Sequence, residues 1–326
     1  MRRNRNCRRP SFSPSVFNRQ SFDVFAGMEN ISSNAGLKGN HSRSRQSFTP
    51  RRVVITPNIT YLSEILESLY KRQLSSEAVM SDLIHSGLTP NFRYRVVEWI
   101  AILCNDFSLR RSVMYSSVAI IDRSLQSISI TKSQMQLIGG VSLWISTKFY
   151  CPNVIRINQI ISKCGDLFNQ EQFHNFEEII LESIDNNINI PNVSDFISLL
   201  EENMACDRPL LMLLWTLSDI HLQFSGFLRF KPSTIATAIM IYSLNCLNRT
   251  FQNEIVTKLV CLEDPKQLYY CIEDIHNVVK DLVNKKKNSV FEQTDKETFN
   301  QAKKWLSRAT LPDVETFIMM LPHNIE

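Results

Sequence analysis

Four charged side chains between residues 92 and 188 lie in predicted amphipathic helices, and three of them interrupt apolar stripes. Arg93 lies in the first turn of a predicted helix, and Asp122 lies beside the apolar stripe of the next. Lys148 and Glu177 fall on two later stripes and are 29 residues apart, the same interval that separates Arg93 from Asp122. A charge on a core-facing stripe is costly unless it is paired or lies at a partner surface. Alone, each could reach water from the margin of its stripe; together they indicate ion pairing or partner binding.

The sequence contains none of the short motifs that carry catalytic chemistry. It has no G-x-x-x-x-G-K or G-x-G-x-x-G phosphate-binding loop, no H-E-x-x-H zinc helix and no G-x-S-x-G nucleophile turn. Its eight cysteines include no C-x-x-C pair, and His221 and His276 stand alone in apolar helical stretches, as core histidines do. We therefore predict that the protein is not an enzyme and has no metal site and no cofactor.

The charged residues belong to four amphipathic helices, which are predicted by apolar residues three and four positions apart. The four stripes are Val96, Trp99, Ile100 and Leu103; Val118, Ile121 and Leu125; Leu137, Val141 and Ile145; and Phe173, Ile180 and Ile184. Further helices are predicted over residues 61–70, 76–85, 208–222, 227–244 with a start at Pro232, 294–306 behind a Thr294 capping box, and 312–321. With only eight glycines in the chain, we predict an all-α protein.

Charge divides the chain into a tail and a body. Residues 1–57 carry eleven basic and two acidic side chains, a net charge of +9, whereas the remaining residues carry 25 and 30, a net charge of −5. The tail is rich in Ser, Asn and Arg and has no sustained period, which predicts a disordered basic tail. After it we expect two helical domains, 58–190 and 191–326, with a terminal helix at the end of the second.

Three short repeats in the tail place a serine two residues after an arginine and directly before a phenylalanine. Ser11, Ser21 and Ser47 in these repeats are candidate phosphorylation sites for basophilic kinases, although compositional bias would give the same pattern. Ser13 and Thr49 each precede a proline, and Thr49 is followed by two arginines. The five arginines within residues 2–9 have the composition of a nuclear-import signal or a nucleic-acid contact, and equally that of a solvated tail.

The cysteines and the apolar runs favour an intracellular protein. Cys104, Cys246 and Cys271 lie inside apolar helical patterns as small hydrophobic residues, and no signal peptide is evident, so we expect a reducing environment. The most apolar runs, 209–217 and 235–247, are shorter than the roughly 20 residues that span a bilayer. We expect no membrane segment and a location in the nucleus and cytoplasm.

The charged residues and their neighbours together resemble the cyclin box. Members of that family carry an arginine in the first box helix, followed by an aspartate, a leucine, a lysine and a glutamate. Here Arg93, Asp122, Leu137, Lys148 and Glu177 keep that order at intervals of 29, 15, 11 and 29 residues. The words RYRVVEW, AIIDRSL, QMQLIGG and STKF around them also match, and the pattern is most similar to A/B-type (mitotic) cyclins. The resemblance implies an all-α fold of two tandem five-helix cyclin boxes preceded by an N-terminal helix.

The resemblance also implies a function. Cyclins bind and activate cyclin-dependent protein kinases, which implies a heterodimer with such a kinase and a role in cell-cycle progression, mitotic or meiotic. In the family, the lysine and glutamate at the positions of Lys148 and Glu177 face outward and hydrogen-bond the backbone that leads into the C-helix of the kinase. The apolar surface next to them would comprise Ile145, Phe149, Leu181 and Ile188.

Two further roles follow from the same resemblance. The pair at the positions of Arg93 and Asp122 ties the first box helix to the second, which implies a structural ion pair. A shelf on the first helix docks Arg-x-Leu peptides of substrates or inhibitors in the family. The matching positions here are Phe92, Val96, Trp99 and Gln136. Arg95 and Ile102 depart from the residue types usual beside that shelf, and Val96 and Trp99 have the spacing of core residues as well.

Departures near the kinase face keep alternatives open. Tyr150 and Cys151 stand where the family usually carries two glutamates, and Asn186 stands where it carries an aromatic residue. The tail has no destruction box (Arg-x-x-Leu) and no Lys-Glu-Asn word. One alternative is a cyclin-fold scaffold that no longer activates a kinase. Another is a promoter-binding protein of the transcription-factor-IIB type, which the acidic body and the absence of paired cysteines in the tail disfavour.

Overall fold

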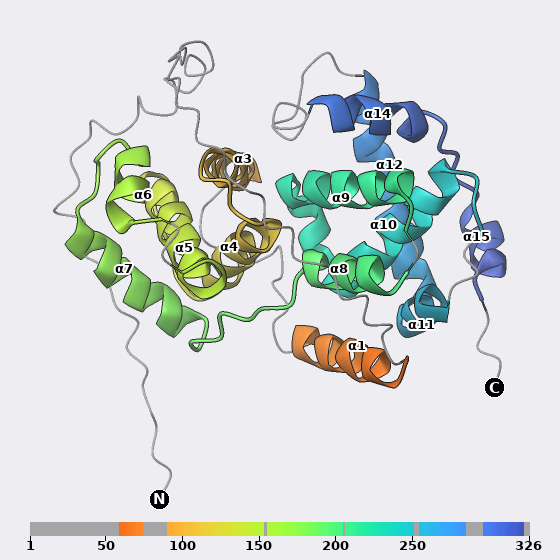
Figure 1. Cartoon of the computed structure of the whole chain (residues 1–326), viewed down its shortest axis with the longest axis horizontal. Helices are drawn as coiled ribbons and strands as arrows, with labels where there is room; N and C mark the ends of the chain where they lie inside the picture. Colours follow the sequence, from red (N-terminus) through yellow and green to blue (C-terminus); the bar gives the residue numbers. More distant parts are fainter. Residues whose placement is uncertain are drawn as a thin grey trace, which may run out of the picture. The chain divides into compact units, whose positions relative to one another are not determined.

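Helices account for all regular structure in the part of the chain that the computed structural model describes, which comprises residues 59–74, 90–152, 155–204, 206–250, 254–284 and 296–322. These residues contain thirteen α-helices and no strand, which confirms the all-α prediction (Figure 1). They belong to a unit that spans residues 53–326. The predicted tail with its candidate phosphorylation sites, the helix over 76–85 and the Thr294 capping box lie outside the described residues.

The first box is built around its third helix. Its helices are α3 (Pro90–Asp106), α4 (Arg111–Ser124), α5 (Met135–Tyr150), α6 (Ile157–Lys163) and α7 (Gln170–Ser183). The other four helices all contact α5 (Figure 1). Most of the side chains of α5 are buried. Gly139 and Gly140 allow this approach, because a Cβ on Gly139 would lie 3.0 Å from Val96 of α3 and one on Gly140 would lie 3.1 Å from Phe173 of α7.

The second box repeats this arrangement. Its helices are α8 (Val193–Asn203), α9 (Arg208–Gln223), α10 (Pro232–Cys246), α11 (Glu254–Leu262) and α12 (Pro265–Asn284), with a 3-10 turn, η4 (Ser225–Arg229), before α10. The third helix, α10, again contacts the other four and is buried on nearly all sides. Pro232 occupies the first position of α10, where its missing N–H costs nothing. The resemblance to the cyclin box implies two tandem five-helix repeats, and the structure adds that the third helix is central in each.

Short polar side chains determine where several helices begin. Asn169, Asn192, Asp207 and Asp313 lie directly before α7, α8, α9 and α15 (Val314–Met320), and the side chain of each accepts a hydrogen bond from a first-turn N–H. Such a cap satisfies one of the backbone donors that a helix start leaves unpaired, and it is worth about 1 kcal/mol. The boundaries of these helices are therefore local properties of the sequence.

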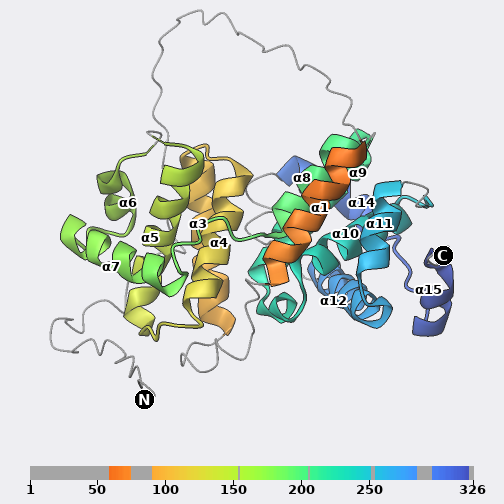
Figure 2. The ribbon, with the colours of Figure 1, turned by 90° about the horizontal axis from the view of Figure 1, so that it is seen from below.

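Helix α1 (Ile59–Leu74) lies against the second box, as Figures 1 and 2 both show. It buries Leu62, Leu66 and Leu69, whereas Ile65, which the sequence places on the same apolar face, is 48% exposed. The Gln73 side chain donates to Ser233 Oγ at 2.8 Å and accepts from the Ser233 backbone N–H at 3.0 Å. These hydrogen bonds attach the C-terminal end of α1 to the start of α10.

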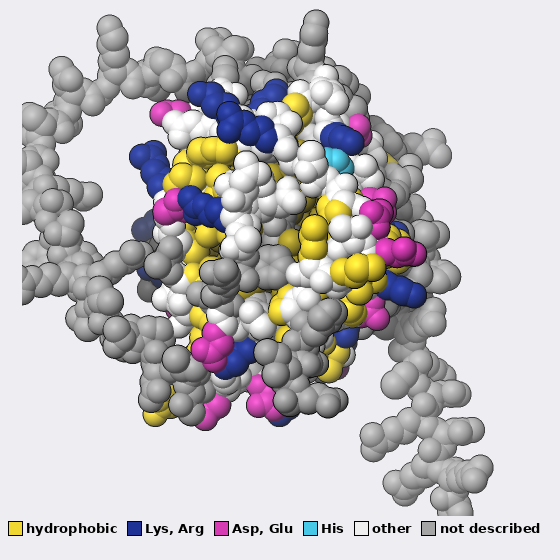
Figure 3. All heavy atoms as spheres, turned by 90° about the vertical axis from the view of Figure 1, so that its right-hand side faces the viewer, with side chains coloured by type: hydrophobic (Ala, Val, Ile, Leu, Met, Phe, Trp, Pro, Cys, Tyr) yellow, Lys and Arg dark blue, Asp and Glu magenta, His cyan; other side chains and the backbone are white. Residues whose placement is uncertain are grey.

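The last two helices, α14 (Lys296–Leu306) and α15, cover the second box. Helix α14 contacts α9 and α12, and α15 contacts α12. On the face that carries α15, hydrophobic side chains lie in patches among polar ones, and Met319 and Met320 are exposed (Figure 3). No described helix has both the length and the apolar character needed to cross a bilayer. Within the described ranges all cysteines are free thiols, and no cluster of metal-ligating side chains occurs.

Candidate functional site

Lys148 and Glu177 come together where the C-terminal end of α5 meets the middle of α7. The Lys148 ammonium forms an ion pair with Glu177 Oε1, and the Lys148 side chain is 44% exposed while that of Glu177 is 10% exposed. The two side chains therefore engage each other, with the lysine at the surface and the carboxylate beneath it. The resemblance implies that both groups face outward. The structure exposes Lys148, buries Glu177 and pairs the two side chains with each other.

Two residues that sequence reasoning did not single out complete this cluster. His174 Nδ1 lies 3.6 Å from Glu177 Oε2, and Lys148 Nζ lies 5.3 Å from the centre of the Trp144 ring. His174 precedes Glu177 by three residues and Trp144 precedes Lys148 by four, so each stands one helical turn before a residue of the pair. That spacing is the signal from which both could have been found.

The apolar surface beside the pair is smaller than the sequence predicts. Phe149 is 51% exposed and packs its ring edge-on against Tyr150, with ring centres 4.9 Å apart, and Leu181 and Ile188 are half-buried. Ile145, in contrast, is 2% exposed. The prediction that Ile145 belongs to the accessible surface was wrong, because its side chain faces the helices that surround α5 and packs in the core.

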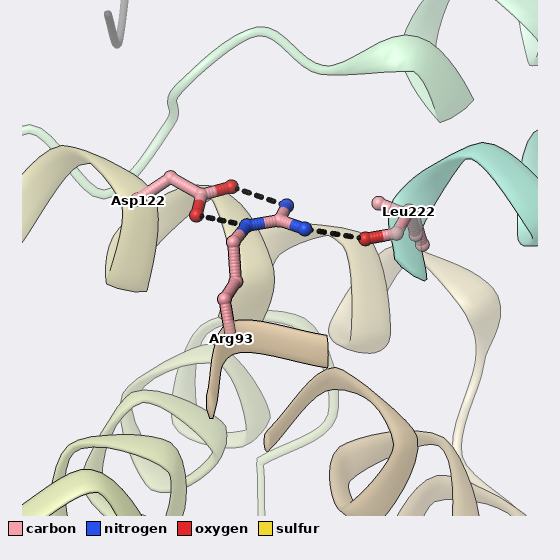
Figure 4. Close-up of polar contacts among 3 residues, drawn as sticks. All are labelled: Arg93, Asp122 and Leu222. Atoms are coloured by element: carbon pink, nitrogen blue, oxygen red, sulfur yellow. Dashed lines mark hydrogen bonds and ion pairs between the residues drawn. The ribbon is translucent and has the colours of Figure 1, made fainter. Parts of the chain in front are cut away.

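Arg93 and Asp122 form a buried pair that joins three helices (Figure 4). Arg93 Nε and Nη2 donate to the two carboxylate oxygens of Asp122 at 2.7 and 2.8 Å, and Nη1 donates to the backbone carbonyl of Leu222 at 2.8 Å. The side chains are 5% and 8% exposed. Since Leu222 lies near the end of α9, the pair links α3 to α4 within the first box and also links both to the second box.

Two family descriptions match most of the described chain. "Cyclin, N-terminal domain" matches residues 62–189, and "Cyclin, C-terminal domain" matches residues 191–307. The chain belongs to the cyclin family. The two matches meet at the short connection between α7 and α8, where the second box begins.

The relatives include B-type and A-type cyclins. The chain is 24% identical over 231 residues to the G2/mitotic-specific cyclin-B3 of Gallus gallus, which covers 69% of this chain and 54% of that protein. It is 20% identical over 245 residues to cyclin-A1 of Homo sapiens, which covers 72% and 52%. These matches confirm the resemblance to A/B-type cyclins. The chain spans about half the length of these curated relatives.

A solved structure shows the same fold. The viral cyclin from herpesvirus saimiri superposes with a TM-score of 0.50 at 20% sequence identity, covering 76% of this chain and 98% of that chain. At this identity the likeness concerns the cyclin fold and not the chemistry of any surface.

The shelf predicted for Arg-x-Leu peptides is closed in this cyclin. Val96, Trp99 and Gln136 are buried, and only Phe92 is half-exposed. Val96 and Trp99 pack against the backbone of α5 at Gly139. The prediction of an accessible patch at these three positions was wrong, because the same apolar spacing that suggests a shelf also drives α3 onto α5.

The departure at Asn186 has a local cause. Asp185 and Asn186 follow α7 with positive φ values of 53° and 56°, and the Asn186 N–H donates to the Leu181 carbonyl at 2.8 Å. Asn and Asp tolerate this left-handed conformation better than other non-glycine residues. Asn186 therefore ends the helix in a tight turn, and it is exposed without adding apolar area beside Leu181 and Ile188.

Proposed function

We propose that this cyclin is the regulatory subunit of a cyclin-dependent protein kinase. The observation that carries the proposal is the Lys148–Glu177 pair, in which an exposed lysine lies above a buried carboxylate, with the exposed ring of Phe149 next to the lysine on α5. In this proposal catalysis belongs to the kinase alone, and the cyclin has no catalytic residue.

In the proposed mode of action, the Lys148–Glu177 pair aligns the cyclin with the kinase, and the apolar surface beside it supplies contact area. Lys148 donates to, and Glu177 accepts from, backbone groups next to the kinase C-helix, while Phe149, Leu181 and Ile188 contact that helix. Charge-assisted hydrogen bonds are directional and stronger than neutral ones, so they align the two proteins. Holding the C-helix inward completes the Lys–Glu pair and the Mg²⁺ site that phosphoryl transfer needs.

A cell-cycle role is the finer part of the proposal. It is supported by the G2/mitotic-specific cyclins among the relatives and by the proline-directed Thr49 and Ser13 in the tail. We place the complex in the nucleus and cytoplasm, on the basis of the arginine cluster within residues 2–9. Because Val96, Trp99 and Gln136 are buried, the proposal does not extend to recruitment of Arg-x-Leu peptides.

The test is co-purification with a panel of cyclin-dependent kinases, followed by a kinase assay. We expect one kinase to bind and to be activated, and Lys148→Ala combined with Glu177→Ala to lower its affinity about 10- to 100-fold, the value of one or two charge-assisted hydrogen bonds. The matched control is Lys163→Ala with Asp106→Ala, which removes another surface ion pair, 2.6 Å long, between α6 and α3.

Two outcomes would reject the proposal. One is that no kinase binds the folded chain, which would favour a scaffold. The other is that a kinase binds and the Lys148–Glu177 double variant behaves like the control.

A further inference from the structure

A cavity of about 450 Å³ lies between the two boxes, away from the Lys148–Glu177 pair. Its walls come from α3 and α4 of the first box, residues 190–193 of the connection, the end of α9, η4, the start of α10 and the turn between α11 and α12. None of the predicted kinase-contacting residues lines it. Its volume falls within the range of about 300–1,000 Å³ that is typical of sites for small organic ligands.

Most of the lining is apolar. Aromatic and aliphatic side chains from both boxes form it, namely Val118, Phe224, Phe227, Leu228, Phe230 and Ile235. A ligand that fits these walls buries an apolar body, and each Å² that it removes from water is worth roughly 25 cal/mol.

The charged and polar residues of the first box that line the cavity are already satisfied. Three hydrogen-bonded pairs satisfy these residues and Gln73 of α1, which also lines the cavity. The pairs are Arg93 with Asp122, Tyr115 with Asp219, and Gln73 with Ser233. The Arg93 charge is thereby neutralised and its guanidinium donors are directed at Asp122 and a backbone carbonyl. It is not available to bind an anion.

Glu263 is different, because half of its carboxylate lacks a partner. The side chain lines the cavity and the residue is 8% exposed. Oε2 accepts from Thr234 Oγ1, whereas Oε1 has no hydrogen-bond partner among the described residues. Lys231 also lines the cavity, and its ammonium lies 5.6 Å from the centre of the Tyr70 ring. Burial raises the pKa of Glu263, and the charge of Lys231 only partly opposes that rise. A buried acceptor without a hydrogen-bond donor is unfavourable, and a ligand that supplies the donor removes that cost.

His221 is the second unsatisfied group of the lining. It is 6% exposed, and its Nδ1 has no hydrogen-bond partner in the described structure. Burial lowers the pKa of His221 to about 3, so the imidazole is neutral at physiological pH. It lies in the wall as an uncharged polar group, which does not repel a bound cation.

We propose that this inter-box cavity binds a small organic cation, with an aromatic or aliphatic body against the phenylalanine walls and an ammonium group on Glu263 Oε1. A bound ammonium supplies the donor that Oε1 lacks and the opposite charge that a buried carboxylate requires. Aromatic rings at the wall attract the same cation through their faces. An anion would instead meet the Glu263 carboxylate. Of the two basic side chains that the second box contributes to the lining, Arg229 is paired with Asp274 and the Lys231 ammonium lies over the Tyr70 ring. The proposal does not depend on kinase binding.

The experiment titrates the full chain with three probes of one shape and different charge: phenethylamine, 2-phenylethanol and phenylacetate. Binding is followed by saturation-transfer NMR and by chemical shifts of the protein. We expect the amine to bind at least tenfold more tightly than the alcohol, and phenylacetate to bind most weakly. Glu263→Gln should lower the affinity for the amine to that for the alcohol. The matched control Asp264→Asn keeps the Oδ1 acceptor that caps α12 and should leave the preference unchanged.

A second variant locates the site. Ala119 lines the cavity from α4, and Ala119→Leu should fill part of it and weaken all three probes while the chain stays folded by circular dichroism. The proposal is overturned if no probe binds, if amine and alcohol bind alike, or if the preference for the amine survives Glu263→Gln. It is also overturned if Ala119→Leu leaves the binding of all three probes unchanged.

Discussion

Two ion pairs in the first box share one interval in the sequence and differ in burial. The Arg93 and Asp122 side chains are 5% and 8% exposed, whereas Lys148 is 44% exposed above a buried Glu177. In the buried pair, each of the three guanidinium nitrogens donates a hydrogen bond inside the fold, two to Asp122 and one to the Leu222 carbonyl. The exposed lysine retains access to solvent and to a partner. Burial, not spacing, therefore separates the structural pair from the candidate binding pair.

The buried pair gives the first prediction. Arg93→Ala leaves the Asp122 carboxylate and the Leu222 carbonyl buried without their donors, so we expect a loss of about 3–5 kcal/mol in the free energy of unfolding. Urea denaturation measures it. The matched control is Lys163→Ala, which breaks an ion pair whose side chains are 44% and 40% exposed and should cost less than about 1 kcal/mol. Equal losses in the two variants would show that the Arg93 pair is not energetically special.

At the scale of helices, the close contact between α3 and α5 depends on the absence of a side chain at Gly139. A Cβ there would lie 3.0 Å from Val96 Cγ1 and 3.2 Å from Trp99 Cζ3, and both neighbours are buried. The same contact closes the predicted peptide shelf. A small residue on one helix thus decides how its neighbour packs and which surface stays accessible.

The second prediction tests this contact. Gly139→Ala should lower the free energy of unfolding by about 1–3 kcal/mol through overpacking, even though alanine favours a helix. Gly226→Ala is the control, because a Cβ on Gly226 of η4 meets nothing within 4 Å and should change stability by no more than about 0.5 kcal/mol. Thermal and urea unfolding of both variants measure the difference. A Gly139→Ala variant as stable as the parent would mean that α3 can shift freely on α5.

At the scale of the whole unit, α9 connects the two boxes through buried polar groups. Asp219 accepts from the Tyr115 hydroxyl of α4 at 2.9 Å, and burial raises the pKa of Asp219. The Leu222 carbonyl accepts from Arg93 of α3. His221 lies between them on the same helix and is buried as a neutral imidazole. The junction between the boxes is therefore sensitive to protonation.

The third prediction follows from the depressed pKa of His221. The imidazole titrates at about 3 in the folded chain, against an ordinary value of 6.5. Above pH 6.5 it is neutral in both states and favours neither. As the pH falls from 6.5 toward 3, the unfolded chain takes up a proton that the folded chain does not, so stability declines by up to about 1.4 kcal/mol per pH unit.

His221→Leu removes this proton uptake. Urea midpoints measured at pH 7, 6 and 5 should fall less steeply for the variant than for the parent chain. Parallel curves for the two proteins would contradict the prediction.

Local patterns in the sequence accounted for most of the fold. The helical period, the caps at Asn169 and Asn192 and the start at Pro232 depend on residues within one turn of each other, so they can be predicted without knowledge of distant contacts. The cyclin resemblance placed Arg93 and Asp122 together, and Lys148 and Glu177 on one face. Trp144 and His174 were missed, although their helical spacing to that pair was visible.

The amino-acid sequence by itself determined the helices, their order in two boxes and the family, because amphipathic periods and capping side chains act over a few residues. Only the tertiary structure decided which apolar residues remain at the surface. It buried Ile145, Val96 and Trp99 and left Phe149 exposed, because exposure depends on neighbours that come from distant segments of the chain. For the same reason, Glu263 and His221 became the unsatisfied groups of one cavity only when the two boxes came together.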